Sequence, residues 1–228
     1  MHGGRDARHE AAVRASLHWY EDVFALHGIP TTVADGLWRA LGEPPRWHSA
    51  AKTLRPDVSV DQVRDAVAGF GHCSVADSYG TLDLGGAGFE RLFTASWLHL
   101  EPLSEHGGWP PGWGTVDDEG ELERWNDAFD TSGVLLPSML GHPRFTVLAC
   151  RAGGALVGGA VLHRTGEFVE LSNCWAVGDG GEDIASMVAC AGILFPQRPL
   201  VGYARGEELD RWCASGFRRT GPQVVWVR

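Results

Sequence analysis

Lysine is almost absent from this sequence: Lys52 is the single lysine, although lysine and arginine together number 19. Aspartate and glutamate number 29, which gives a formal net charge of −10 at pH 7. Such a surface repels phosphate backbones, and the densest basic stretch is the pair Arg218-Arg219. Nucleic acid is therefore not an expected partner. The scarcity of lysine beside abundant alanine and glycine suggests a GC-rich bacterial genome.

Long apolar runs and paired cysteines are also missing. No run reaches the roughly 18 apolar residues of a membrane span, and residues 1–6 lack the apolar region of a signal peptide. The five cysteines are odd in number and include no Cys-x-x-Cys pair, which argues for a reducing compartment. His72, Cys73 and Asp77 have no second ligand pair at metal spacing. We therefore expect a cytoplasmic protein without a membrane partner and without a metal.

The periodicity of apolar residues predicts an α/β chain with a mixed sheet. Ser59 and Gln62 have the spacing of a capping box, which marks the beginning of one helix. Gly153-Gly154 between two apolar segments indicates a hairpin. The predicted helices are residues 6–26, 35–41, 59–70, 82–89, 118–129, 182–195 and 207–215. The predicted strands are residues 72–79, 93–100, 145–151, 155–163, 168–175, 200–204 and 224–227.

A loop rich in proline and glycine, residues 101–114, predicts a boundary between an N-terminal part, residues 1–110, and a C-terminal part, residues 111–228. A weak internal repeat crosses this boundary. Both copies have the pattern of a short helix, a Gly-Phe pair, an arginine and a tryptophan. The copies are Asp83…Gly88-Phe89…Arg91…Trp97 and Asp210…Gly216-Phe217…Arg219…Trp226. Either the match is accidental, or the N-terminal part is a worn copy of the C-terminal part.

The segment 168–195 is predicted to be a central strand, a glycine-rich loop and a largely apolar helix. Simple alternation would place Phe168, Glu170, Ser172 and Cys174 on one face of the strand and Val169, Leu171, Asn173 and Trp175 on the other. Both faces carry apolar side chains, which is typical of a strand covered on both sides. A glycine loop before a helix presents N–H groups to an anion or a thioester ligand.

Glu170 is the candidate general base. A carboxylate in the middle of an apolar strand is costly to bury unless it is paired, and burial favours its neutral form. A carboxylate with a raised pKa is suited to accept a proton from an amine, directly or through water. The structural alternative is a carboxylate that bonds a neighbouring arginine or backbone group.

The order of these elements resembles the GNAT superfamily of N-acyltransferases. The resemblance is carried by Leu156-Val-Gly-Gly-Ala-Val161, by the central strand, and by Trp212-Cys-Ala-Ser-Gly216-Phe217 before the last strand. It covers residues 115–228, and the repeat suggests an incomplete GNAT-like lobe in residues 1–110. In that family the central strand diverges from its neighbour, here Leu200–Ala204. The pantetheine arm of acetyl-CoA, or of another acyl-CoA, lies in the gap.

The resemblance implies a set of cofactor-binding positions along the end of the central strand and the following loop. These positions are Trp175, Ala176, Val177, Gly180, Gly181 and Asp183. Asn173 is a further candidate for a hydrogen bond to the pantetheine or the substrate, although a bulge at the strand end is the favoured alternative. The loop departs from the family pattern, because it is short, lacks a basic residue and carries Asp179, Glu182 and Asp183 where a pyrophosphate would bind.

A second departure concerns the general acid. Trp212 stands where the family often has a tyrosine, and Arg205 stands near its common asparagine. Tyr203 is the nearest phenol that is able to replace the missing acid, although a packed tyrosine is the structural alternative. Cys174 has no histidine placed beside it and is expected to be a small buried hydrophobe.

Three functions follow from the resemblance. The first is an N-acyltransferase that moves an acyl group, an acetyl group first of all, from acetyl-CoA or another thioester to a small amine. The second is a catalytically inactive, GNAT-like ligand-binding module. The third is a transferase that depends on an acyl carrier protein, which presents only a pantetheine arm and needs no pyrophosphate site.

Overall fold

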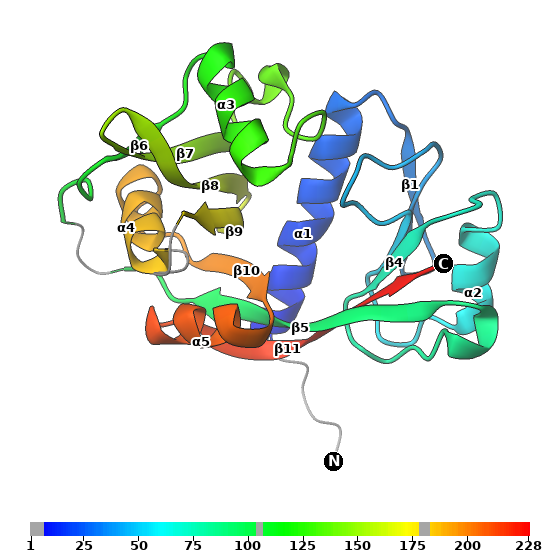
Figure 1. Ribbon diagram of the computed structural model, residues 1–228. Helices are drawn as coiled ribbons and strands as arrows, with labels where there is room; N and C mark the ends of the chain where they lie inside the picture. Colours follow the sequence, from blue (N-terminus) through cyan, green and yellow to red (C-terminus); the bar gives the residue numbers. More distant parts are fainter. Residues whose placement is uncertain (1–6, 104–106, 178–182) are drawn as a thin grey trace. The chain divides into compact units, whose positions relative to one another are not determined.

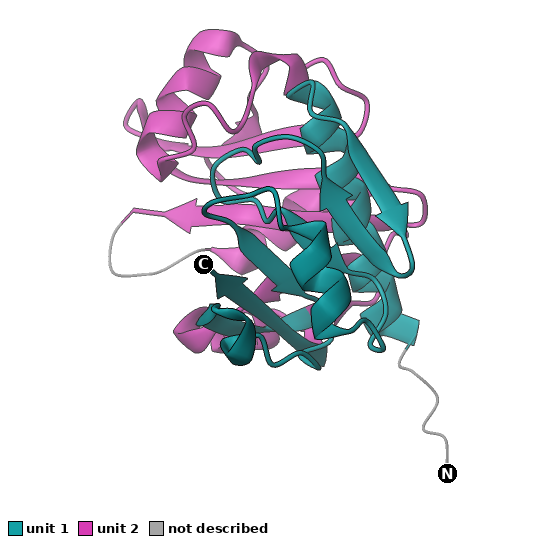
Figure 2. Cartoon of the chain, turned by 90° about the vertical axis from the view of Figure 1, so that its right-hand side faces the viewer, with its two compact units in different colours: residues 1–97, 220–228 teal, residues 98–219 magenta. Residues whose placement is uncertain are grey.

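The computed structural model describes residues 7–103, 107–177 and 183–228. The chain divides into two compact units (Figure 2). Unit 1 consists of residues 1–97 and 220–228, and unit 2 consists of residues 98–219. The division falls at residues 97/98 and again at 219/220, and the predicted boundary between two lobes at residues 110/111 stays a prediction. Unit 1 is therefore completed only by the last residues of the chain.

Unit 1 begins with a long helix, α1 (Ala7–Leu26), and contains the shorter helix α2 (Val60–Ala66) and the 3-10 turn η1 (Gly85–Ala87). Its strands are β1 (Thr31–Ala34), β2 (Leu37–Ala40), β3 (Ala51–Thr53), β4 (Ser74–Asp77), most of β5 (Glu90–Leu100) and most of β11 (Arg218–Val227) (Figure 1). The strand order is β1-β2-β3-β4-β11-β5. The pair β3–β4 is parallel, and β4 pairs with β11 in antiparallel fashion.

Unit 2 contains the helices α3 (Glu119–Phe129), α4 (Ile184–Leu194) and α5 (Gly206–Ala214), and the 3-10 turn η2 (Pro137–Met139). Its strands are β6 (Trp113–Thr115), β7 (Phe145–Ala152), β8 (Ala155–Thr165), β9 (Phe168–Ala176) and β10 (Leu200–Ala204). The order is β10-β9-β8-β7-β6. All these pairs are antiparallel except β9–β10, which is parallel. The predicted mixed α/β architecture is confirmed.

One predicted helix, residues 35–41, is wrong. Residues 31–40 form the hairpin β1–β2, in which Ala34 pairs with Leu37. Asp35 and Gly36 both have positive φ, 52° and 80°, and this is the two-residue turn that Asp-Gly favours between twisted strands. The Asp-Gly pair is the signal of this turn, but the apolar residues after it also fit helical spacing. The short strands β3 and β6 were also missed, because three residues show no period.

Other local signals were confirmed. Ser59 Oγ accepts from Gln62 N over 3.2 Å, and Gln62 Oε1 accepts from Ser59 N over 2.8 Å, which completes the capping box of α2. Gly153 and Gly154 have φ of 57° and 83° and connect β7 to β8. Gly88 ends η1 in the left-handed region. No helix within the described residues is both long enough and apolar enough to cross a membrane.

Each unit has its own apolar core on the side of its crossover helix. In unit 1, Val63 and Val67 of the α2 region pack with Ala51 and Val75 of the parallel strands. In unit 2, residues of α4 and α5 pack with Val169 and Leu200, again on the parallel pair. Each unit thus contains a hairpin, a third strand, a helix and a parallel fourth strand, in that order. The idea that residues 1–110 are GNAT-like remains a prediction, and this shared connectivity supports it.

Candidate functional site

Strand β9 carries a bulge at Asn173. In the β8–β9 ladder Gly159 pairs with Trp175 and Val161 pairs with Ser172, so two residues of β9 lie opposite one residue of β8. Asn173 has a φ of 49°, a left-handed conformation that asparagine adopts more readily than most residues. Its Nδ2 donates to Ser172 Oγ over 3.1 Å. The backbone thus changes course at Asn173, one of the predicted cofactor-binding positions.

The bulge reverses the faces that simple alternation predicted for the end of β9. Cys174 packs against the core that includes Leu171, on the α4 side. Trp175 lies on the opposite side, where its ring stacks on Phe129 of α3 at a centroid separation of 6.3 Å. The predicted grouping of Cys174 with Glu170, and of Trp175 with Val169, is therefore wrong. One inserted residue moves every later side chain to the other face of a strand.

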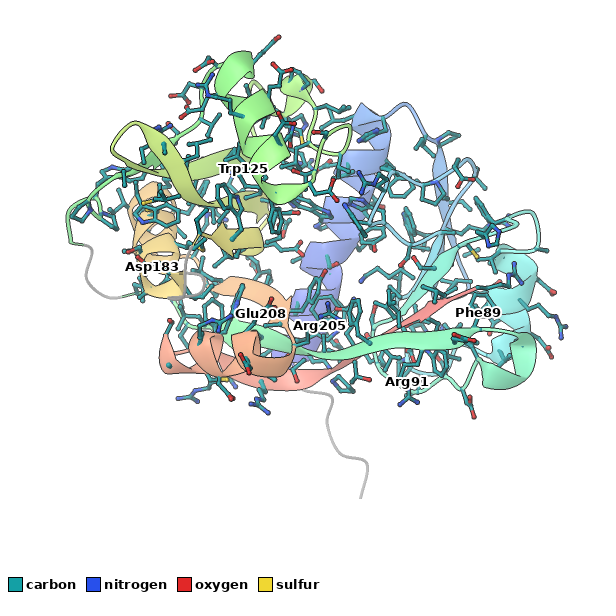
Figure 3. The ribbon with its side chains drawn as sticks, viewed as in Figure 1. Phe89, Arg91, Trp125, Asp183, Arg205 and Glu208 are labelled. Atoms are coloured by element: carbon teal, nitrogen blue, oxygen red, sulfur yellow. The ribbon has the colours of Figure 1, made fainter. Side chains whose placement is uncertain are left out.

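Trp125 of α3 fixes the helix against this second face of the sheet (Figure 3). Its ring meets Trp175 edge-on, with centroids 5.7 Å apart, and its Nε1 donates to Leu148 O over 2.9 Å. Gly159 leaves the necessary space, because a Cβ there would lie 2.2 Å from Trp125 Nε1. The glycine that the sequence matched to the family pattern thus has a local packing role.

Strands β9 and β10 are paired over a short distance. Among the described residues their register contains two pairs, Leu200 with Val169 and Val201 with Glu170, whereas β9 continues to Ala176. Gly202 still approaches the neighbouring strand, since a Cβ there would lie 2.7 Å from Leu171 O. The register of the two strands therefore ends at Glu170 and Val201, and Gly202 remains close to Leu171 beyond it.

The backbone beyond this point leaves some groups available to a ligand. Val177 N donates to Val157 O over 2.8 Å, so Val177 is directed toward β8. Consecutive residues of an antiparallel strand direct their backbone groups to opposite sides. The N–H and C=O of Ala176 therefore point away from β8, toward the β10 side of the sheet and beyond the last register pair of β9 with β10. Of the predicted cofactor-binding positions, Ala176 is the one whose backbone groups this geometry directs away from β8.

Glu170 and Tyr203 lie on one face of the parallel pair. Val201 is the register partner of Glu170, and Tyr203 is two residues farther along β10, so its side chain points to the same face. Glu170 is 3% exposed, whereas Tyr203 is 42% exposed. The sequence therefore named a buried carboxylate and an accessible phenol that the fold places on the same face, where the strands separate.

His163 is a residue of this face that the sequence analysis missed. It lies directly opposite Glu170 in the β8–β9 ladder, is fully buried, and packs on the ring of Phe145 with a centroid separation of 4.6 Å. Side chains of such partners lie within contact distance. The signal was visible, because His163 is a polar residue within an apolar strand, as Glu170 is. What the sequence lacked was the register that joins them.

The beginning of α4 bears on phosphate binding. Gly180 and Gly181 lie outside the described residues, so the structure says nothing of these two predicted positions. Asp183 is the N-cap (Figure 3), and its Oδ1 accepts from Ser186 N over 3.0 Å. The side chain thus occupies one of the N–H groups that would bind an anion, and it places a carboxylate at the helix N-terminus, where an acidic residue is stabilising.

Trp212 of α5 is part of the unit 2 core rather than of an open site. It is 3% exposed, and its ring lies 4.7 Å from that of Phe217. A Cβ on Gly202 would lie 2.9 Å from the Trp212 ring. The indole therefore fills the space against β10. Only glycine fits at position 202 without a shift of this ring.

The cysteine thiols are weak nucleophiles, and the side chains that could bind a metal do not cluster in the described residues. Burial raises the pKa of Cys190 to about 12, and burial also raises the pKa of Cys150, so both thiols stay protonated and weakly nucleophilic. The Cys174 Sγ lies 3.8 Å from Ser172 O. Within residues 7–103, 107–177 and 183–228, no group of three or more metal-ligating side chains comes together.

Comparison with known proteins gives a consistent fold and no close relative. No family model matches the chain, and no curated protein matches it in sequence. A GCN5-related N-acetyltransferase from Kribbella flavida has a TM-score of 0.64 at 15% identity, over 93% of this chain and 94% of that one. A putative acetyltransferase of the GNAT family from Novosphingobium aromaticivorans has a TM-score of 0.62 at 13% identity, over 97% of this chain and 98% of that one.

A third similar structure carries no activity in its description. It is a conserved protein of unknown function from Staphylococcus epidermidis, with a TM-score of 0.64 at 12% identity, over 88% of this chain and 94% of that one. At such identities the similarity concerns the fold. Each of these structures is covered almost completely by the chain, so the likeness extends over both units.

Proposed function

The chain has the fold of the GNAT superfamily, and from that premise we propose that it is an N-acyltransferase. It transfers an acyl group, in the first instance acetyl, from acetyl-CoA or another acyl-thioester to a small amine. The thioester is a co-substrate, and neither metal nor nucleic acid takes part. We further propose a cytoplasmic location, which five free cysteines support.

One observation carries this proposal: the register pairing of β9 with β10 ends at Glu170 and Val201, whereas β9 continues to Ala176. The bulge at Asn173 and the outward backbone of Ala176 provide an edge along which an extended pantetheine arm can pair. An extended ligand that adds to an exposed strand obtains its affinity from main-chain hydrogen bonds. Asn173, Trp175 and Val177 then contribute through the course of the backbone more than through their side chains.

We assign acyl transfer to the face that carries Glu170 and Tyr203. One proton leaves the attacking amine, and another is given to the departing thiolate. The amine nitrogen attacks the thioester carbonyl carbon, and Glu170 accepts the proton that the amine loses, directly or through a water. The C–S bond then breaks, and Tyr203 protonates the departing thiolate. Backbone N–H groups of the separated β9 edge stabilise the negative oxygen. His163 lies opposite Glu170 and is positioned to orient its carboxylate.

The test separates binding from turnover. We expect acetyl-CoA and CoA to give a calorimetric signal and a thermal shift, and Glu170→Gln to preserve that binding while it abolishes acylation of amines in a panel. Tyr203→Phe should reduce turnover less than Glu170→Gln does. Tyr79→Phe, in unit 1, is the matched control and should change neither quantity. The absence of any binding at millimolar acetyl-CoA would remove the CoA-dependent function.

A carrier-protein donor is favoured by a separate observation, the capping of α4 by Asp183. A carboxylate there opposes a pyrophosphate, and a carrier protein delivers the pantetheine arm without one. Under this alternative, transfer proceeds from a loaded acyl carrier protein and fails with the matching CoA ester. Equal rates with both donors would contradict it.

An inactive ligand-binding module is the remaining alternative, and the buried Trp212 favours it, because the usual phenol of the last helix is replaced by a core indole. Such a module would bind acetyl-CoA or pantetheine without acylating any amine. Any turnover that disappears in Glu170→Gln excludes this alternative.

A further inference from the structure

A pocket of about 290 Å³ lies in unit 1, apart from the residues of the proposed transferase site. It is lined by Glu10, Val13, Arg14 and Leu17 of α1, by Leu54 and by Tyr79. Leu54 directly follows β3, and Tyr79 follows β4 by one intervening residue. The pocket therefore opens at the carboxyl ends of two parallel strands, the edge at which open α/β sheets bind their ligands.

One face of α1 supplies the wall of this pocket. Glu10, Val13, Arg14 and Leu17 follow one another at spacings of three and four residues, so their side chains form one stripe. The floor is held firmly: Tyr79 Oη donates to Leu54 O over 3.2 Å, and the His9 ring packs on the Tyr79 ring at 4.9 Å. His9 Nε2 also lies 2.8 Å from Ser78 O. The two loops and the helix are thus fixed to each other without a ligand.

The lining combines apolar surface with both signs of charge. Val13, Leu17 and Leu54 offer aliphatic contacts, and the Tyr79 ring offers an aromatic one. Arg14 forms no ion pair or hydrogen bond with any residue in the described part of the chain, so its guanidinium is available to an anion. Glu10 precedes Arg14 by one helical turn, which places a carboxylate roughly 5–6 Å away at the level of the Cβ atoms.

We propose that this pocket binds an α-amino acid with an apolar side chain, or a small molecule of the same chemistry. Arg14 receives the carboxylate in a charge-assisted hydrogen bond, and Glu10 faces the ammonium group. The side chain of the ligand packs on Leu17, Leu54 and the Tyr79 ring. The volume suits one such molecule, since it lies at the lower end of small-ligand sites of about 300–1,000 Å³. The site is independent of the proposed transferase chemistry.

Three probes that share one ring test the assignment: L-phenylalanine, 3-phenylpropionate, which lacks the ammonium, and phenethylamine, which lacks the carboxylate. Titration calorimetry on the full chain should rank L-phenylalanine first. Arg14→Gln should weaken its binding about tenfold or more, because a charge-assisted hydrogen bond is lost. Arg14→Lys should retain part of the affinity. Arg39→Gln, an arginine of β2 away from the pocket, is the matched control and should change nothing.

Leu17→Trp provides a second test, because it fills the pocket from the same helix and should abolish binding while α1 stays folded by circular dichroism. The proposal would be overturned if phenethylamine bound with the same affinity as L-phenylalanine. It would also be overturned if Arg14→Gln left the affinity for L-phenylalanine unchanged. Absence of binding by all three probes at low-millimolar concentration would do the same. Acetyl-CoA binding should be unaffected by Arg14→Gln, which keeps this result distinct from that of the proposed function.

Discussion

The crossover β3–α2–β4 of unit 1 and the crossover β9–α4–β10 of unit 2 share one connectivity and one register. Ala51 pairs with Val75 and Lys52 with Ala76, as Val169 pairs with Leu200 and Glu170 with Val201. In each unit both residues of the first pair, Ala51 with Val75 and Val169 with Leu200, face the core of the crossover helix. Lys52 therefore occupies in unit 1 the position that Glu170 occupies in unit 2.

The two positions differ in what surrounds them. Lys52 is fully buried, and its Nζ lies 4.8 Å from the Trp97 ring centroid and 5.2 Å from that of Tyr20. Glu170 is also buried, but Tyr203 on the same face is half exposed. Aromatic rings close the position in unit 1, whereas the separated strands leave the position in unit 2 next to an accessible phenol. The comparison teaches that a shared crossover sets where a buried charge stands, whereas the neighbouring side chains decide whether that charge is enclosed.

Removal of residues 220–228 is expected to have the largest effect. Unit 1 would lose β11, whose Val224 and Trp226 are in its core, and Arg228 Nη2 would no longer bond Val67 O and Phe70 O at 2.9 and 3.1 Å. We expect unit 1 to unfold, with rapid proteolysis and loss of amide protection in residues 7–97. Arg219→Gln is the control, since it breaks an exposed ion pair with Asp210 that contributes about 0–1 kcal/mol. A protected unit 1 in the truncated chain would contradict the division into units.

Changes of charge at the equivalent positions, Lys52 and Glu170, should have the next largest effect. Lys52→Glu should cost about 3–5 kcal/mol in the free energy of unfolding, because a carboxylate would face the negative surfaces of two aromatic rings in a buried place. Lys52→Met should cost far less, because it keeps the volume and removes the need to bury a charge. Denaturant titration measures both. Glu170→Gln should change stability by less than Lys52→Glu does, and an equal loss would show that Glu170 is a structural charge.

Two glycines, Gly159 and Gly221, each lie directly against an aromatic ring, one in a core and one only half-buried. A Cβ on Gly159 would lie 2.2 Å from Trp125 Nε1, and a Cβ on Gly221 would lie 2.1 Å from His9 Nδ1. Trp125 is enclosed in the core, so Gly159→Ala should cost about 2–3 kcal/mol. His9 is held by Ser78 O and the Tyr79 ring but is only half-buried near the beginning of α1, so Gly221→Ala should cost less, about 1 kcal/mol. Thermal unfolding of the two variants decides whether the second contact is as stiff as the first.

Unit 1 should also lose stability in mild acid. Burial lowers the pKa of His48 to about 4, and Nε2 of the ring accepts from Trp19 Nε1 over 3.1 Å. The contact of Nδ1 with Arg46 O, at 3.0 Å, raises the pKa and offsets only part of this shift. The unfolded chain binds a proton below about pH 6.5 and the folded chain does not, so stability falls as pH drops from 6.5 toward 4. The loss is roughly 1–3 kcal/mol. His48→Gln should flatten this part of the pH profile, and an unchanged profile would assign the effect to other groups.

The helix caps give the smallest effects. Ser59→Ala removes half of the α2 capping box and should cost about 1 kcal/mol. Asp183→Asn keeps a good cap on α4, so its stability change should be a few tenths of a kcal/mol, but it removes a negative charge from the proposed phosphate end of the site. CoA affinity should rise in Asp183→Asn and stay constant in Ser59→Ala. Unchanged affinity in both would favour a donor without a pyrophosphate.

Much of the fold was determined by the sequence alone. Helix α1, the capping box of α2, the Gly-Gly hairpin, the central strand and β10 were all predicted at or near their observed positions, because each depends on apolar period or turn chemistry within a few residues. The GNAT resemblance came from the same local order of elements. Glu170 and Tyr203 could be named because a carboxylate inside an apolar strand and a phenol near a strand end are visible in sequence.

Only the tertiary structure decided how these parts meet. The register that sets His163 opposite Glu170, the bulge that sends Trp175 toward α3, and the return of β11 to unit 1 all depend on pairing between distant residues. The same is true of the match between Lys52 and Glu170. A strand's period says which residues share a face, but hydrogen bonds to the neighbouring strand decide which face it is and what stands across from it.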